Sequence, residues 1–299
     1  MNNEERLKLG HYCVSFIDLL GQRLEYQNEG LLPKFDSDEE KANFINKLKN
    51  TIGRINDLQR ASNTFLKAAL GYRSPERELL PPDQQRLYDE MKEVYFKQQR
   101  WSDGLFYFAP LMEGKAKCPI GGVYTMLVST GSLCFLGLAK KMPLRGSIDI
   151  AWATEFHEGE LYGAAVAKAY ELENYVAQYP RIVVGPRVID YLTDNMNNSA
   201  PDIYGQYNRA VAKTCYDMLS LDSDGYHFVH YLGDVFHKIV TRDLHQQLYQ
   251  ESMTFILEQR EKWRQERNTK LAFRYDHLMS YFLGYPLSKS QAENTKPSA

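Results

Sequence analysis

Two aspartates stand where their carboxylates could hold metal ions. Asp18 lies in the apolar run FIDLLG, and Asp103 lies between the apolar segments EVYFKQQRW and LFYFAP. Carboxylate oxygens are the ligands that Mg²⁺ and Mn²⁺ prefer, and two such ions about 4 Å apart can activate an attacking hydroxyl and steady a phosphate leaving group. The simpler alternative for Asp18 is a turn residue, since acids near a glycine such as Gly21 are common in turns.

The elements around these aspartates are predicted from sequence periodicity. Residues 12–20 read as a strand, and a capping box of Ser37 and Glu40 then opens a helix. The apolar residues of this helix follow helical spacing at Phe44, Leu48, Ile52, Ile55 and Leu58. A shorter helix is predicted over residues 83–93. Asp103 falls at the tip of the hairpin that follows, and this hairpin can lie beside the first strand.

Residues 118–139 carry no charge and are long enough to cross a bilayer. Their glycines, serines and threonines make membrane insertion poor, so we predict a helix buried against a sheet. Further elements are predicted as a strand in LRGSIDIAW, a helix over 163–177, a strand in RIVV, a hairpin around DSDG and a helix over 234–268. Because strands and helices interleave, the chain is predicted to have an α/β fold.

Composition excludes several classes of function. The chain has 299 residues, 43% of them hydrophobic, and a net charge of -2, which offers no basic field for nucleic acid. The cysteines are isolated, with no CxxC pair, at Cys13, Cys118, Cys134 and Cys215. Reduced thiols in a cytoplasmic protein fit this pattern best. The N-terminal MNNEERLKLG has no apolar segment of the kind that signal peptides carry.

Two other polar groups are weaker candidates for ligands. His227 and His230 are three residues apart on an expected strand, which points them to opposite faces, so a shared metal is not predicted. The DSDG at 222–225 resembles the start of a calcium loop but lacks the later ligands. A hairpin turn is the favoured interpretation.

Five segments together resemble a known family. FIDLLG, WSDGLFYF, LRGSIDIA, GELYGAAVAKAYELE and YPRIVVGPRVIDYL occur in the order seen in class III nucleotide cyclases, and most closely in the bacterial pyrimidine cyclases of the Pycsar antiphage systems. The resemblance implies a ferredoxin-type cyclase core over residues 1–232 with a helical insertion at about 37–93. A C-terminal helical extension over 233–285 and a disordered tail over 286–299 are expected to follow.

The resemblance also implies a site and a reaction. Asp18 and Asp103 match the aspartates that hold two divalent cations, Mg²⁺ or Mn²⁺, in that family. The triphosphate would lie against the backbone of the turn after the first strand, formed by Ile17, Leu19, Leu20 and Gly21. The reaction is attack of a nucleotide's 3'-hydroxyl on its α-phosphorus, which expels pyrophosphate and leaves a 3',5'-cyclic monophosphate. Such a transfer depends on alignment and charge neutralisation.

The chain departs from the purine cyclases at two positions. The asparagine and arginine that steady the transition state there are replaced by Ala167 and Glu171. Another cation is therefore needed, and the candidates are Arg145, Lys168 and Arg181, although each can equally be an ordinary ion-paired residue. A catalytically inactive sensor that only binds nucleotide is the alternative. Two like charges without a metal would be costly, and this favours an active site.

The base-reading positions favour a pyrimidine. The resemblance places Glu160 where adenylate cyclases use aspartate, and Gln99 or Arg100 near their base-reading lysine. A carboxylate can accept the N3 hydrogen of uracil but would meet a lone pair at N3 of cytosine. We therefore predict conversion of UTP to cyclic UMP, with CTP and cyclic CMP as the alternative.

The resemblance further predicts the assembly and the setting. Cyclases of this type build each site from two chains, so a homodimer with two shared sites is expected. The cyclic product would act on a separate cyclic-nucleotide-gated effector in antiphage defence. No nucleic acid and no membrane is expected as a partner of this cytoplasmic protein.

Overall fold

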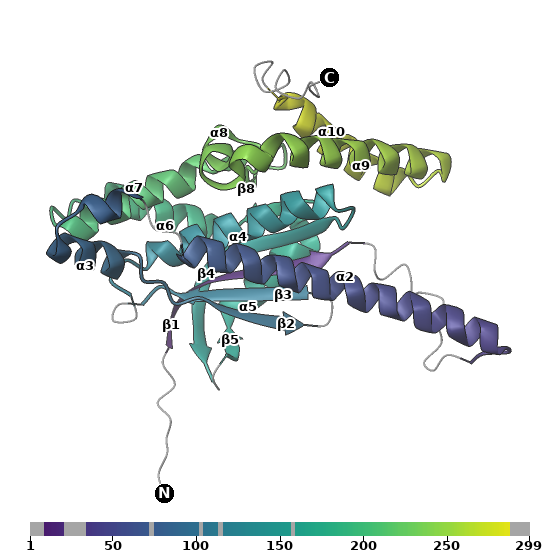
Figure 1. Cartoon of the computed structure of the whole chain (residues 1–299), viewed down its shortest axis with the longest axis horizontal. Helices are drawn as coiled ribbons and strands as arrows, with labels where there is room; N and C mark the ends of the chain where they lie inside the picture. Colours follow the sequence, from purple (N-terminus) through teal and green to yellow (C-terminus); the bar gives the residue numbers. More distant parts are fainter. Residues whose placement is uncertain are drawn as a thin grey trace, which may run out of the picture.

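A computed structural model describes residues 9–20, 34–71, 75–101, 104–112, 116–156 and 159–287 (Figure 1). Its centre is one eight-stranded mixed sheet. The strands are β1 (Leu9–Leu19), β2 (Lys97–Trp101), β3 (Gly104–Pro110), β4 (Leu144–Glu155), β5 (Leu161–Gly163), β6 (Ile182–Val184), β7 (Leu219–Leu221) and β8 (His227–Val229).

Helices cover both faces of this sheet. The α-helices are α2 (Asp38–Gly71), α3 (Pro82–Met91), α4 (Ile120–Ala139), α5 (Ala164–Glu171), α6 (Pro186–Asn197), α7 (Ile203–Asp217), α8 (Asp234–Phe236), α9 (His245–Gln265) and α10 (Thr269–Gly284). Short 3-10 or π turns occur at η1 (Pro75–Leu79), η2 (Leu172–Val176), η3 (His237–Thr241) and η4 (Arg242–Leu244).

The first half of the chain has ferredoxin-type topology. Strand β1 pairs antiparallel with both β3 and β4, and β2 pairs antiparallel with β3. The order β2-β3-β1-β4, with helices between β1 and β2 and between β3 and β4, is a split βαβ arrangement. The predicted α/β fold with a ferredoxin-type sheet is confirmed. Strand β6 extends the sheet by pairing parallel to β4.

Alternation along β1 divides the core into two layers. Cys13 and Ile17 face the larger core, which contains α4, whereas Val14 and Phe16 face a smaller core that contains α5 residues. Successive side chains of a strand point to opposite faces. Asp18 therefore lies on the same face as Phe16, beneath the α5 layer.

Helix α4 is the apolar segment that the sequence marked as long enough to span a membrane. It is the one helix of that length and hydropathy among the described residues, and 89% of its apolar window is buried. The helix packs against the sheet, where a Cβ at Gly122 would lie 2.8 Å from Cβ of Ala109. The prediction of a helix buried against a sheet is confirmed.

Helix α2 begins as its capping box predicts. The Ser37 hydroxyl accepts a hydrogen bond from the Glu40 backbone N–H at 3.2 Å. Ile55 and Leu58, from the predicted apolar stripe, are buried, but Leu48 and Ile52 are exposed. Figure 1 shows the first part of α2 projecting beyond the sheet.

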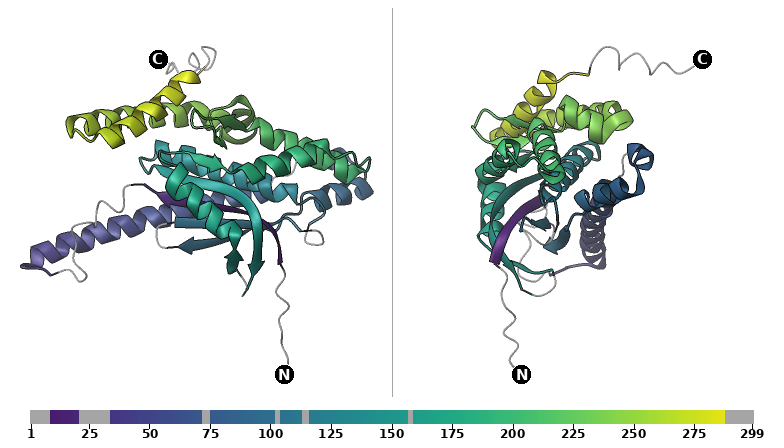
Figure 2. Two further views of the ribbon diagram at one scale, coloured as in Figure 1. Left: turned by 180° about the vertical axis from the view of Figure 1, so that it is seen from behind. Right: turned by 90° about the vertical axis from the view of Figure 1, so that its left-hand side faces the viewer.

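The C-terminal helices pack on α4, on the side away from the sheet (Figures 1 and 2). The continuous helix predicted over 234–268 is wrong in one respect, because the chain turns at Arg242, where φ is 42°, and α9 starts only at His245. Leu278 and Phe282 belong to the same hydrophobic core as α4. The division into a catalytic domain over 1–232 and an extension over 233–285 stays a prediction. Most of the predicted tail, residues 288–299, lies outside the described residues.

Candidate functional site

Asp18 lies near the end of the central strand β1, directly opposite Arg145 of β4 in the antiparallel register. Cross-strand partners share a face of the sheet. Arg145 Nη2 is 3.7 Å from Asp18 Oδ2, and the two side chains are 10% and 15% exposed. The structure thus brings together a predicted metal ligand and a predicted catalytic cation.

A second carboxylate approaches Arg145 from the other side. Glu173 Oε1 lies 2.6 Å from Arg145 Nε, and the Glu173 side chain is only 2% exposed. Glu173 comes from η2, the π turn that continues α5. Glu173 is the last residue of the AYELE segment. Its position in the sequence relative to Asp18 and Arg145 gives no signal that it belongs to the site. An acid–arginine–acid row of Asp18, Arg145 and Glu173 is therefore the polar centre of this face.

The other predicted metal ligand, Asp103, lies outside the described residues, as does Gly21. The strands on either side of position 103 are described, and they pair so that Gly104 faces Trp101 and Leu105 faces Ile17. This register brings the flanks of the hairpin turn to the Asp18 end of β1.

Asp18 is the one predicted metal ligand that the structure describes at this end of the sheet. The Asp18 carboxylate supplies oxygen ligands of the kind that Mg²⁺ and Mn²⁺ take. The described residues contain no group of three or more His, Cys, Asp or Glu side chains that could hold an ion. Within them, Asp18 is the predicted ligand, and the two-cation site stays a prediction.

The backbone predicted to cradle a triphosphate is described by the structure up to Leu20. Ile17 and Leu19 are buried in β1, and Leu19 pairs with Leu144. The Leu20 backbone N–H donates a hydrogen bond to the Pro143 carbonyl at 2.9 Å. A phosphate contact from the Leu20 N–H would therefore require this bond to open.

The predicted base-reading residues separate onto two faces. Gln99 and Arg100 are adjacent on β2, so their side chains point in opposite directions. Arg100 Nη1 donates to Asn56 Oδ1 on α2 at 3.4 Å. A Cβ placed on Gly159 would lie 3.8 Å from Gln99 Nε2, so Gln99 lies beside the segment that carries the exposed Glu160. Of the two predicted base-reading residues on β2, Gln99 is the one that lies beside the Glu160 segment, whereas Arg100 binds α2.

An ion pair between β2 and β4 accounts for this proximity. Lys97 binds Glu155 near the end of β4, and the Gly159 backbone N–H donates to Glu155 Oε1 at 3.2 Å. Figure 2 shows β4 as a long curved strand. Curvature and the ion pair bring the β4–β5 connection to β2.

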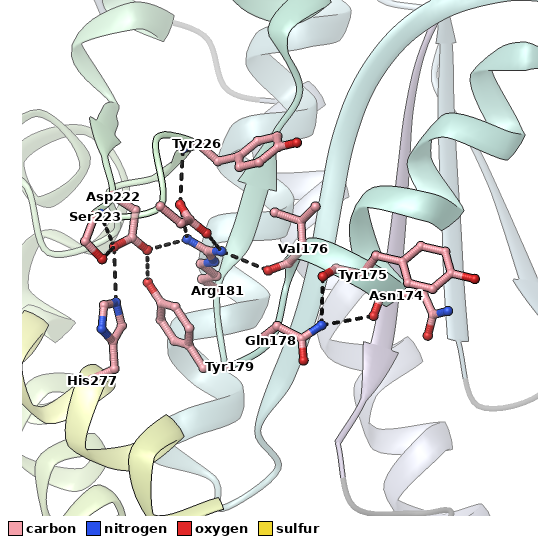
Figure 3. A network of polar contacts seen from close by, with 11 residues as sticks. Asn174, Tyr175, Val176, Gln178, Tyr179, Arg181, Asp222, Ser223, Tyr226 and His277 are labelled. Carbon is pink, nitrogen blue, oxygen red and sulfur yellow. Dashed lines mark hydrogen bonds and ion pairs between the residues drawn. The ribbon is translucent and has the colours of Figure 1, made fainter. Parts of the chain in front are cut away.

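Arg181 is engaged away from Asp18. Its guanidinium, 3% exposed, forms ion pairs with Asp222 and Asp224, and it lies 4.7 Å above the Tyr179 ring (Figure 3). Both aspartates belong to the DSDG turn between β7 and β8, and the predicted hairpin there is confirmed. Burial raises the pKa of Asp222, but hydrogen bonds from His277 and Tyr179 outweigh it and hold the pKa well below its ordinary value. The catalytic role of Arg181 stays a prediction that these contacts disfavour.

Lys168 of α5 lines a pocket whose lining residues do not include Asp18 or Arg145. This pocket of about 330 Å³ is lined by Lys168, Glu171 and the buried Asp149 among others. Burial raises the pKa of Asp149, and its carboxylate accepts hydrogen bonds from the backbone N–H groups of Ile150 and Arg187. The catalytic role of Lys168 stays a prediction.

Comparisons with known proteins give little beyond this geometry. No protein family model matches the chain, and no curated protein sequence matches it. A solved structure described as a bacterial light-regulated adenylyl cyclase aligns with 82% of this chain and 99% of its own, at 11% sequence identity and a TM-score of 0.37. A TM-score of that size does not by itself establish a common fold.

Proposed function

We propose that this protein is a nucleotide cyclase that forms a 3',5'-cyclic monophosphate from a nucleoside triphosphate. The observation that carries the proposal is the pairing of Asp18 with Arg145 at one end of a ferredoxin-type sheet, beside the hairpin that bears Asp103. The fold alone would not support an activity, because the same topology serves many functions. The five-segment resemblance to class III cyclases gives the pair its chemical meaning.

The residues have distinct roles in this proposal. Asp18 and Asp103 hold two Mg²⁺ or Mn²⁺ ions, which when bound neutralise the triphosphate and lower the pKa of the attacking 3'-hydroxyl. Arg145 binds phosphate oxygens through its planar guanidinium, a geometry that suits phosphate better than a lysine does. A buried arginine at this point stabilises the charge that develops on the leaving pyrophosphate.

UTP is the proposed substrate and cyclic UMP the product, with CTP as the second candidate. The position of Gln99 beside the Glu160 segment supports a shared base-reading role for these two residues. An ionised Glu160 accepts from N3 of uracil, and the Gln99 amide donates to a flanking carbonyl oxygen. A nucleotide-binding sensor without turnover is the competing function, favoured by the absence of the usual arginine at Glu171.

We further propose that the active form is a cytoplasmic homodimer with two shared sites, which signals to a cyclic-nucleotide-gated effector in antiphage defence. Exposed aromatic side chains near the β4–β5 connection support an association surface. Phe156 and Tyr162 are 47% and 67% exposed, and their rings make an edge-to-face contact with the centroids 5.9 Å apart. Exposed aromatic side chains of this kind are typical of protein interfaces.

The test is to incubate the full chain with each of the four nucleoside triphosphates and Mn²⁺, and to identify the products by mass spectrometry. Cyclic UMP is the expected main product, and Asp18→Asn is expected to abolish it. Asp190→Asn is the matched control, because Asp190 lies in an exposed pair with Arg187 on α6. Nucleotide binding without any cyclic product would support the sensor instead.

A further inference from the structure

Arg145 is shared unequally between its two carboxylates. The Nε–Oε1 distance to Glu173 is 2.6 Å, whereas the Nη2–Oδ2 distance to Asp18 is 3.7 Å, and both are ion-pair contacts. Charged pairs interact more strongly where water is excluded, and the Arg145–Glu173 pair is the more deeply buried of the two. Glu173 is therefore the closer and the more deeply buried of the two carboxylates that pair with Arg145.

The backbone that carries Glu173 is itself held in place. Arg181 Nη2 donates to the Val176 carbonyl at 2.8 Å, and Gln178 Nε2 donates to the Tyr175 carbonyl at 2.8 Å (Figure 3). Both carbonyls belong to η2, the turn that contains Glu173. The carbonyls at the end of a helical segment need such partners, and here the buried Arg181 and the exposed Gln178 supply them. Arg181 thus contributes to the site by fixing the position of η2.

A second arginine makes the charge on Glu173 more important. Arg274 of α10 donates to Gln178 Oε1 at 2.9 Å. Burial lowers the pKa of Arg274, and the nearby positive charge of Arg145 lowers it further. The two guanidinium groups therefore repel each other, and of the two it is Arg145 that pairs with the Glu173 carboxylate.

We propose that Glu173 is a positioning residue of the cyclase site, which holds Arg145 back from Asp18 so that Asp18 can bind a divalent cation while Arg145 meets the triphosphate. This inference rests on the proposed function for the identity of its ligands. Without the Glu173 charge, Arg145 closes onto Asp18 as a short two-point ion pair, which is the preferred geometry of arginine with a carboxylate. That pair then competes with the cation for the Asp18 oxygens.

The experiment is a titration of the full chain with Mn²⁺ alone, in which electron paramagnetic resonance measures free Mn²⁺. Glu173→Gln keeps the shape of the side chain and removes its charge, and it is expected to weaken Mn²⁺ binding by roughly 10- to 100-fold. The double variant Glu173→Gln with Arg145→Met is expected to recover most of the lost affinity, because the competing guanidinium is gone. A merely structural role for Glu173 gives the opposite order, with the double variant no better than the single one.

Controls separate misfolding from loss of binding. Glu258→Gln removes the same charge from an exposed pair with Lys141 and should bind Mn²⁺ as the wild type does. The double variant removes both buried charges, a change that proteins often tolerate well, so it can be tested even if Glu173→Gln unfolds. Glu173→Asp, which keeps the charge on a shorter side chain, should lie between the wild type and Glu173→Gln.

The two proposals fail in different ways. If the wild type turns over no nucleoside triphosphate, the cyclase function is lost, but the order of Mn²⁺ affinities still decides the role of Glu173. If the wild type is active and Glu173→Gln matches it in Mn²⁺ affinity and in the KM for nucleotide, the positioning role is refuted and the cyclase function stands. A wild-type chain that binds no Mn²⁺ also refutes the positioning role.

Discussion

His277 of α10 lies 3.1 Å from Asp222 in the β7–β8 turn, measured from Nε2 to Oδ1 (Figure 3). The same aspartate forms an ion pair with Arg181 and accepts a hydrogen bond from the Tyr179 hydroxyl. One buried carboxylate thus joins the C-terminal helix to the loop that leads from η2 into β6. The C-terminal helices are connected in this way to the segment that positions Glu173.

The first prediction concerns the pH dependence contributed by Asp222. Its pKa is lower in the folded protein than in the unfolded chain, so its stabilisation is present above the unfolded pKa of about 4 and is lost as the pH falls below that value. Asp222→Asn should lower the free energy of unfolding by about 3 kcal/mol at pH 7 and by about 1 kcal/mol less at pH 3, where the carboxyl is protonated in the unfolded chain but not yet in the folded protein. Urea unfolding at both pH values measures this.

The exposed pair of Asp190 with Arg187 supplies the control for that measurement. Asp190→Asn should change the free energy of unfolding little at either pH. A loss of equal size at pH 7 and pH 3 in Asp222→Asn would show that the carboxylate charge does not matter there.

The second prediction concerns how sites are shared between chains. If one protomer supplies the metal aspartates and its partner supplies the base-reading groups, Asp103→Ala and Glu160→Ala should each be nearly inactive alone. Mixing the two variants should restore one working site per mixed dimer, because two-fold symmetry leaves one site with all its groups. Native mass spectrometry confirms that mixed dimers form, and mixed dimers without activity would contradict the shared site.

The third prediction concerns the choice of base. Glu160→Gln replaces an acceptor by an amide that can also donate to N3 of cytosine. The ratio of kcat/KM for UTP over CTP should fall by about tenfold, which is the usual range for one altered base contact. Competition assays with both triphosphates measure the ratio, and exposed Glu261→Gln, whose carboxylate accepts from Gln265, is the control. An unchanged ratio would assign base reading to other residues.

The fourth prediction concerns the C-terminal helices as part of the core. Phe282 is fully buried, and its ring centroid lies 6.3 Å from that of Phe135 on α4. Phe273 on the same helix is 68% exposed. Phe282→Ala should lower the free energy of unfolding by about 3 to 5 kcal/mol. Phe273→Ala should lower it by less than about 1 kcal/mol. Similar losses in the two variants would argue against a shared core.

The local elements were largely predictable because each depends on residues close in sequence. Periodicity and turn residues predicted β1, the β2–β3 hairpin and the buried helix α4, and the structure confirms them. Helices α6 and α7 were not predicted, and the break at Arg242 was not visible. That break depends on how the segment before α9 turns against the core, which no local pattern records.

The site shows the same limit at the level of side chains. The sequence by itself identified Asp18 as a charge at the end of an apolar strand and Arg145 and Arg181 as candidate cations. Only the tertiary structure decided which acids these arginines meet. The register of β1 with β4 sets Asp18 opposite Arg145, the turn after α5 brings Glu173 to the same guanidinium, and the β7–β8 hairpin engages Arg181. Ion pairs between distant segments depend on sheet register and helix packing, and these are fixed only when the whole hydrophobic core forms.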